Sequence, residues 1–251
     1  MWNNIIHHPS SIFHLESHPP SSIINHIFPQ TSYASAPSET TSLLQLSYIL
    51  FDDAGLLVLL YIVYYPMNII KTNIDGVVAL EPLVHKDTRG YLFEAFSQRE
   101  FDEQVQKVQF VYENEYKRPL GFVTGIHFQK PPYSQNQLVR CVSGRIRFIA
   151  LDIRRGSSTY GQYVSVELSD ESHHMLFIPQ GFAVGYVVLS EHAVIQCKYD
   201  KEFSAESVCG INITDKALGI DFGLYSNELL QSEEDAHYPS FEDLHTPFIK
   251  S

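Results

Sequence analysis

The chain has 251 residues, enough for one large domain or two small ones, and 44% of them are hydrophobic, enough for a sizeable core. Its net charge of −12 excludes a general attraction for nucleic acid or anionic lipid, so an anionic ligand would need a local group of Lys and Arg. Three cysteines without CxxC spacing argue against a disulfide framework or structural zinc, and favour a reducing, cytoplasmic setting.

The first 66 residues differ in composition from the rest. They contain no Lys or Arg, so all 17 basic residues lie in 67–251. Residues 1–42 are rich in Ser, Pro, His and Asn without periodicity, which is typical of disorder. The apolar stretch 43–65 contains Asp52 and Asp53, each costing about 3 kcal/mol at mid-bilayer, so no membrane span is expected. We therefore expect 1–66 to be a disordered or non-native extension, and the domain 67–251 to begin naturally at Met67.

Short strands and turns alternate from residue 67 onward. Strands are predicted at 77–80, 91–96, 110–114, 122–129, 138–142, 145–153, 162–168, 175–178, 184–189 and 193–199. Residues 98–106 have the spacing of one short helix, and 220–251 predict a helical or irregular tail. Turn signals every 8–12 residues or so are typical of an antiparallel sandwich or jelly roll. The expected fold is all-β, with a few short peripheral helices.

Five segments, in this order and at these separations, carry a resemblance to one protein family: DTRGYLFEAF, GFVTGIHFQKPP, LDIRRGSSTYG, IPQGFAVGY and TDKALGIDF. Together they resemble the dTDP-4-dehydrorhamnose 3,5-epimerase family from residue 68 to about residue 244. The resemblance implies a cupin-type jelly-roll barrel without metal or cofactor. It also implies an isomerase of dTDP-rhamnose and polysaccharide biosynthesis that takes a dTDP-linked 4-keto-6-deoxy sugar and forms a homodimer, with neither nucleic acid nor membrane as partner.

Epimerisation beside a ketone explains the residue types that the resemblance selects. Removing the hydrogen at C3 or C5 gives an enolate, so the site needs a base on one face of the sugar and a proton donor on the other. The resemblance assigns the role of base to His127. It assigns to Asp215 the role of the aspartate that hydrogen-bonds the imidazole ring of His127. It places Cys197 where the family has a donor tyrosine, and Tyr199, two residues on, shares that strand face.

The resemblance also assigns positions that bind the substrate. Those expected to do so here are Arg89, Glu94, Asn114, Gln129 and Gln137. Besides Cys197, four positions depart from the family in residue type: Gln137 stands for a lysine near the C4 oxygen, Thr124 for a diphosphate-binding arginine, Val184 for a second histidine and Tyr112 for a glutamine. Arginine offers a bidentate charged fork where threonine offers one hydroxyl, so the change at position 124 bears on diphosphate binding.

Three functions stay open at this point. The first is an epimerase acting at C3, C5 or both, including a one-carbon epimerase or ketoisomerase variant. The second is a catalytically degenerate relative that only binds a nucleotide sugar. The third, a metal-dependent cupin, is the least favoured, because three or four ligands must converge on a metal, whereas His127 stands alone and Val184 occupies the later histidine position.

Overall fold

The computed structural model describes residues 45–51, 57–63, 67–225 and 228–250. Antiparallel strands form two large sheets and two small ones. The five-stranded sheet has the order β11 (Tyr163–Ser169), β10 (Arg145–Asp152), β13 (Phe182–Val188), β8 (Val123–Gln129), β15 (Val208–Gly210). The six-stranded sheet has the order β3 (Asn68–Lys71), β4 (Val78–Glu81), β12 (Met175–Ile178), β9 (Gln137–Ser143), β14 (His192–Tyr199), β7 (Tyr112–Pro119).

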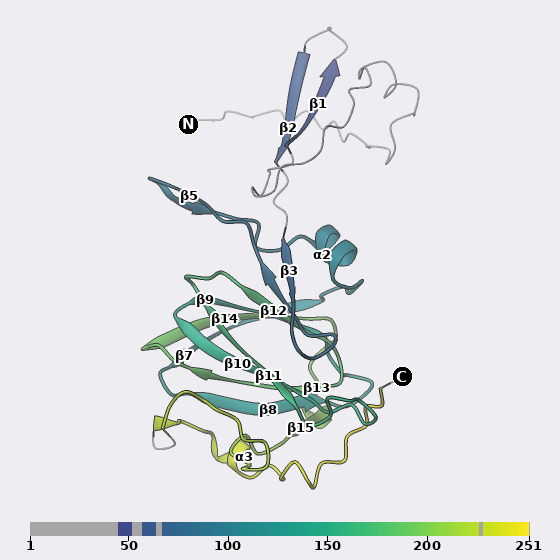
Figure 1. The fold of residues 1–251 in the computed structure, drawn as a ribbon, viewed down its shortest axis with the longest axis vertical. Helices are drawn as coiled ribbons and strands as arrows, with labels where there is room; N and C mark the ends of the chain where they lie inside the picture. Colours follow the sequence, from purple (N-terminus) through teal and green to yellow (C-terminus); the bar gives the residue numbers. More distant parts are fainter. Residues whose placement is uncertain (1–44, 52–56, 64–66, 226–227, 251) are drawn as a thin grey trace, which may run out of the picture. The chain divides into compact units, whose positions relative to one another are not determined.

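The two large sheets face each other and enclose the main core (Figure 1). Phe148 on β10 and Val188 on β13 come from one sheet, and Val139 on β9 and Ile195 on β14 come from the other. Side chains alternate between the two faces of a strand, so each strand gives every second residue to this core. The arrangement confirms the all-β, jelly-roll prediction. The described helices are short: α2 (Gln98–Gln104), the 3₁₀ turn η1 (Ala205–Ser207) and α3 (Glu233–Ala236).

Two small hairpins differ from the expectation. β1 (Gln45–Phe51) pairs with β2 (Leu57–Val63) inside the extension expected to be disordered or non-native, most of which, residues 1–44 included, lies outside the described part. The apolar, β-branched runs flanking Asp-Asp-Ala-Gly are a hairpin signal. The strand predicted at 91–96 is also wrong, because β5 (His85–Asp87) and β6 (Gly90–Leu92) form a short exposed hairpin that ends at Leu92.

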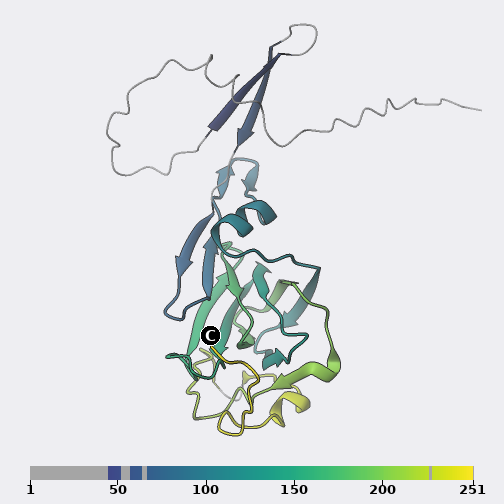
Figure 2. The ribbon, with the colours of Figure 1, turned by 90° about the vertical axis from the view of Figure 1, so that its right-hand side faces the viewer.

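The C-terminal segment covers the outer face of the five-stranded sheet. It is yellow in both ribbon views and lies along β8 and β15 (Figure 1, Figure 2). Phe241, Leu244 and Phe248 pack against Val123 and Ile126 of β8 in a second core on that face. The tail is irregular apart from α3, as predicted, and this packing brings its polar residues close to the back of β8.

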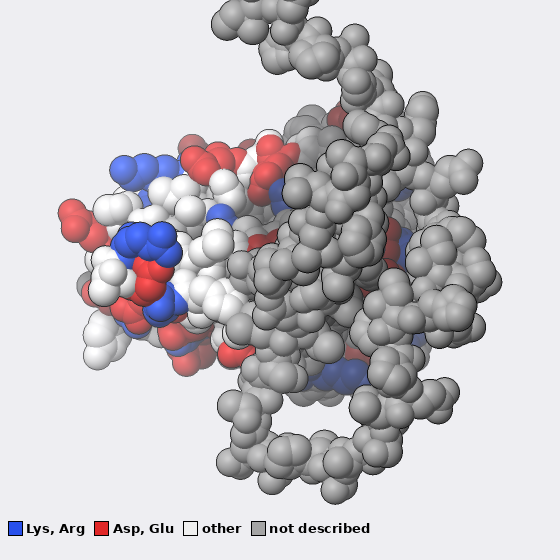
Figure 3. Space-filling model, turned by 90° about the horizontal axis from the view of Figure 1, so that it is seen from above, with Lys and Arg blue, Asp and Glu red and all other residues white. Residues whose placement is uncertain are grey.

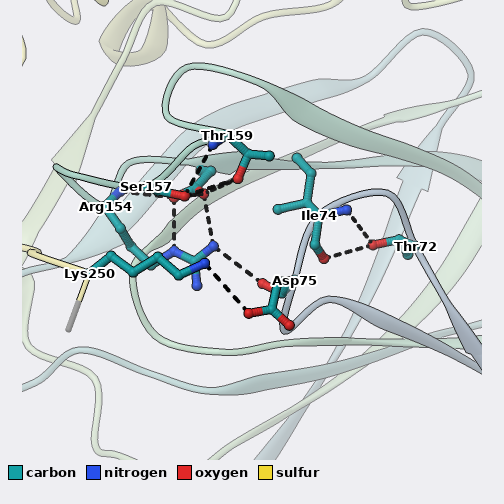
Figure 4. A network of polar contacts seen from close by, with 8 residues as sticks. Thr72, Ile74, Asp75, Arg154, Ser157, Thr159 and Lys250 are labelled. Atoms are coloured by element: carbon teal, nitrogen blue, oxygen red, sulfur yellow. Dashed lines mark hydrogen bonds and ion pairs between the residues drawn. The ribbon is translucent and has the colours of Figure 1, made fainter.

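Loop 152–159 is held by a buried carboxylate, whose partners Arg154, Ser157 and Thr159 are labelled in Figure 4. Asp152 accepts hydrogen bonds from Arg154 Nε (2.9 Å), Ser157 Oγ (2.7 Å) and Thr159 Oγ1 (2.7 Å). Arg154 also donates to the carbonyl of Asp75, whose side chain pairs with Lys250. The network therefore joins three segments that are distant in sequence.

The described surface in Figure 3 shows acidic and basic side chains intermingled with uncharged ones. Within the described residues, no helix is long and apolar enough to cross a membrane.

Candidate active site

A cavity of about 250 Å³ opens between the two large sheets. His127 and Thr124 on β8, with Val184 on β13, line one wall. The opposite wall belongs to the six-stranded sheet, where β7 and β14 contribute alternate residues. The strand that carries the predicted base therefore forms part of a cavity wall.

A β-bulge turns His127 toward this cavity. Strict alternation along β8 from Thr124 would put residue 126 on the cavity side, but the pairing of β8 with β13 shifts register between Val184 and Tyr186. Gly125 lies in the shifted segment with φ +93°, and a Cβ there would come within 2.5 Å of the Val184 carbonyl oxygen. Ile126 is consequently buried on the tail side, and His127 pairs with Val184 and faces the cavity.

The imidazole of His127 is held by Asp235. Nε2 of His127 lies 2.7 Å from Oδ1 of Asp235, and Oδ2 of the same carboxylate accepts from the backbone N–H of Gly125 at 3.2 Å. Asp235 is only 5% exposed, and the Ser232 hydroxyl accepts from its backbone N–H. A carboxylate only accepts, so Nε2 carries the hydrogen and the Nδ1 lone pair is left to take a proton.

The structure corrects the predicted partner of His127. The carboxylate of Asp215 accepts from the backbone N–H groups of Ala217 (2.9 Å) and Phe241 (2.7 Å), so it caps a turn and anchors the tail. The sequence did contain a signal for Asp235, because Ser232 followed three residues later by an acid is a capping-box pattern. That pattern marks a helix start but does not show that the helix packs against β8.

Tyr238 packs beside the base. Its ring meets the His127 ring edge-on, with centroids 5.2 Å apart. Gly210 on β15 pairs with His127, and a Cβ at this glycine would come within 2.4 Å of the Tyr238 ring. The missing side chain at Gly210 therefore lets Tyr238 lie against the imidazole and restrict its rotation.

The opposite wall presents a thiol and several phenols. Cys197 lines the cavity but is only 4% exposed, and burial raises the pKa of its thiol to about 12. Burial, with smaller effects from Cys197 and Tyr116, raises the pKa of Tyr199 well above 10. The Tyr116 hydroxyl accepts from Asn114 Nδ2 at 2.9 Å. Both the thiol and the Tyr199 phenol therefore keep their protons at neutral pH.

The predicted substrate-binding residues fall into two groups. Asn114, Gln129 and Gln137 line the cavity, although the side chain of Gln129 is already bonded to the backbone at Tyr133, Glu202 and Ser204. Arg89 and Glu94 do not line it within this chain. Arg89 is 88% exposed in the β5–β6 turn, where it pairs with Asp87, and Glu94 is exposed just beyond β6. The structure thus brings the first group, but not the second, to His127.

Ligands for a metal do not gather at the cavity. Among the described residues, no three His, Cys, Asp or Glu side chains are grouped closely enough to hold a metal ion. The arrangement instead places a histidine–carboxylate pair on one wall and neutral donors on the other, which suits proton transfer at a carbon acid.

Comparison with known proteins places this geometry in a family. The family model described as dTDP-4-dehydrorhamnose 3,5-epimerase matches residues 71–243. An enzyme of that name from Shigella flexneri is 42% identical over 178 residues, covering 70% of this chain and 97% of its own. The archaeal enzyme of that name from Methanothermobacter thermautotrophicus is 39% identical, over 67% of this chain and 91% of its own.

A solved structure agrees with the sequence relatives. The dTDP-6-deoxy-D-glucose-3,5-epimerase of Legionella pneumophila, in complex with dTDP-4-keto-L-rhamnose, is 33% identical and superposes with a TM-score of 0.70. The match covers 74% of this chain and all of that one. The chain therefore belongs to the dTDP-4-dehydrorhamnose 3,5-epimerase family.

Proposed function

We propose that the protein is an isomerase of deoxysugar biosynthesis that epimerises a dTDP-linked 4-keto-6-deoxyhexose at C3, C5 or both. The observation that supports this most strongly is the pair His127–Asp235 facing a cavity in a chain of this family. A hydrogen beside the C4 ketone is acidic enough for imidazole because the negative charge passes to the ketone oxygen. Nδ1 of His127 takes this hydrogen, and Asp235 stabilises the imidazolium that forms.

Inversion requires a new proton from the face opposite His127. Cys197, selected from the sequence, stays a prediction for this donor. Tyr199 is the second candidate, because its phenol lies beside that thiol and is less deeply buried. We favour the phenol, because a proton donor must reach the sugar carbon and the Cys197 thiol is only 4% exposed.

The active unit is proposed to be a homodimer. Tyr91 and Leu92 on the β5–β6 hairpin are 59% and 61% exposed, and exposed apolar strands favour pairing with another chain. A second copy would also give Arg89 and Glu94 a cavity to reach, which they lack in their own chain. Light scattering at micromolar concentration should give twice the mass of one chain, and a monomer would refute the proposal.

Three free thiols agree with a cytoplasmic location.

Product analysis tests the activity. Incubation with a dTDP-4-keto-6-deoxyglucose in water, followed by NMR coupling constants of the ring protons, reports the configuration at C3 and C5 separately. Inversion at either carbon supports the proposal and distinguishes the one-carbon variant from the two-carbon enzyme. Tight binding without inversion or proton exchange would leave the degenerate binding relative as the function.

A further inference from the structure

Arg118 is the one Lys or Arg side chain among the described residues that line the cavity. It lies near the end of β7, on the wall opposite His127. β7 residues at even positions line the cavity, whereas Glu113, Glu115 and Lys117 are exposed on the other face. The strand's alternation therefore directs this cation inward.

The charge of Arg118 has no acidic partner. The described ion pairs, counted to 4.0 Å, do not include it. Its one recorded hydrogen bond to backbone runs from Nη1 to the Lys117 carbonyl oxygen at 3.1 Å, and its Nε is buried without any partner. A half-buried cation with an unsatisfied donor is costly unless an anion completes its contacts.

Aromatic rings hold the guanidinium in place. Its central carbon lies 4.9 Å from the centre of the Phe122 ring and 5.4 Å from that of Tyr116. Such packing fixes the plane of the guanidinium, and a planar fork held in this way can grip two phosphate oxygens at once.

The position of Arg118 relative to the base identifies the anion. The guanidinium interacts with the hydroxyl of Tyr186, which pairs across the sheet with Thr124, three residues before His127. A sugar with its C3 or C5 at His127 is linked through C1 to a diphosphate, so the negative charge lies one ring away from the base. Arg118 is the described cation available at the cavity wall for that charge.

We propose that Arg118 binds the diphosphate of the nucleotide sugar across the cavity from Thr124. The assignment rests on the proposed function for the identity of its ligand. Arg118 is a binding residue in this account, so it acts on affinity for the nucleotide rather than on the proton transfer at His127.

Calorimetric titration with dTDP tests the assignment without requiring turnover. Arg118→Met should weaken dTDP binding by about 10- to 100-fold, the loss expected for a charge-assisted bidentate contact, and Arg118→Lys should recover part of it. Lys117→Met is the matched control, since it removes a cation from the next residue on the exposed face and should leave affinity unchanged. Thermal melting of each variant verifies that it is folded.

The outcomes separate this inference from the proposed function. Unchanged dTDP affinity in folded Arg118→Met, or no binding of dTDP by the wild type at millimolar concentration, would overturn the assignment. Unchanged affinity with a lower kcat would move Arg118 to the ketone oxygen and overturn it equally. Wild-type protein that binds dTDP through Arg118 but never inverts a keto sugar would refute the epimerase proposal and leave the diphosphate site standing.

Discussion

His127 depends on the carboxylate of one aspartate. Substituting Asp235 and Asp215 in turn shows which aspartate this is. Asp235→Asn should lower kcat by about 10²- to 10⁴-fold, because an amide can donate to Nε2 and leave the hydrogen on Nδ1, where the base must accept. Asp215→Asn is the matched control and should keep a kcat near that of the wild type, since Asp215 only caps backbone groups. The reverse ranking of the two variants would restore Asp215 as the partner of His127.

The donor opposite His127 can be identified by two mild substitutions. Tyr199→Phe should slow inversion by about 10²-fold or more while hydrogen exchange at the base's face persists, because only the donor is removed. Cys197→Ala should change inversion little, because its thiol is almost fully buried beside the phenol. Rates of inversion and exchange measured on the same samples give the answer. Loss of inversion in Cys197→Ala with normal inversion in Tyr199→Phe would return the role to Cys197.

The sequence predicted part of this site, and geometry explains the rest. His127 was predicted to face the substrate because it lies in a segment that matches the family, and Cys197 because ungapped matching of the later strand puts it at the position of the family's tyrosine; both line the cavity. Asp235 and Arg118 were missed. Asp235 lies 108 residues from its partner along the chain and approaches β8 only because the tail packs on its outer face. Arg118 could be assigned to the cavity only once the length of β7 was known, since the predicted strand ended at residue 114 and β7 continues to Pro119.

At the scale of elements, the buried carboxylate of Asp152 determines the stability of loop 152–159. Thr159→Val removes one of its hydrogen bonds with little change of shape and should lower the free energy of unfolding by about 1–3 kcal/mol. Ser158→Ala, one residue earlier and exposed, is the control and should have almost no effect. Urea denaturation measures both, and equal stability of the two variants would contradict a structural role for the network.

This contribution has a defined dependence on pH. Burial alone would raise the pKa of Asp152, but hydrogen bonds from Arg154, Ser157 and Thr159 outweigh it and hold the pKa well below its usual range. A group whose folded pKa is lowered stabilises the fold above its unfolded value, about 3.9, and that stability is lost as pH falls toward the folded value. The network therefore stabilises fully at neutral pH and progressively less below about pH 4.

Element prediction succeeded where apolar alternation was strong and failed at the edges. β9, β10, β12 and β14 lie within about two residues of their predicted ranges because buried residues recur regularly along each strand. β6 is three residues long and exposed throughout, so no burial pattern specified its end. The β1–β2 hairpin was not predicted, because the apolar composition of residues 43–65 was considered only as a possible membrane span.

For the whole molecule, the domain is expected to begin at Met67. The backbone N–H of Met67 donates to the buried carboxylate of Glu100 at 2.8 Å, and its side chain packs with Leu80 and Phe101. A chain that starts there would place its α-ammonium at the same carboxylate and keep the contact. Such a chain should melt within a few degrees of the full chain by differential scanning calorimetry. Aggregation of the shortened chain, with the full chain folded, would show that the domain needs residues before 67.

The central claim is that His127 removes a hydrogen beside the sugar ketone. The direct measurement is proton NMR of a dTDP-4-keto-6-deoxyglucose in D₂O with wild-type protein and with His127→Asn, observed at C3 and C5. The wild type should replace at least one of these hydrogens by deuterium, and His127→Asn should slow the replacement by about 10²-fold or more, because an amide cannot act as the base. Exchange at the wild-type rate in a folded His127→Asn protein would contradict the account.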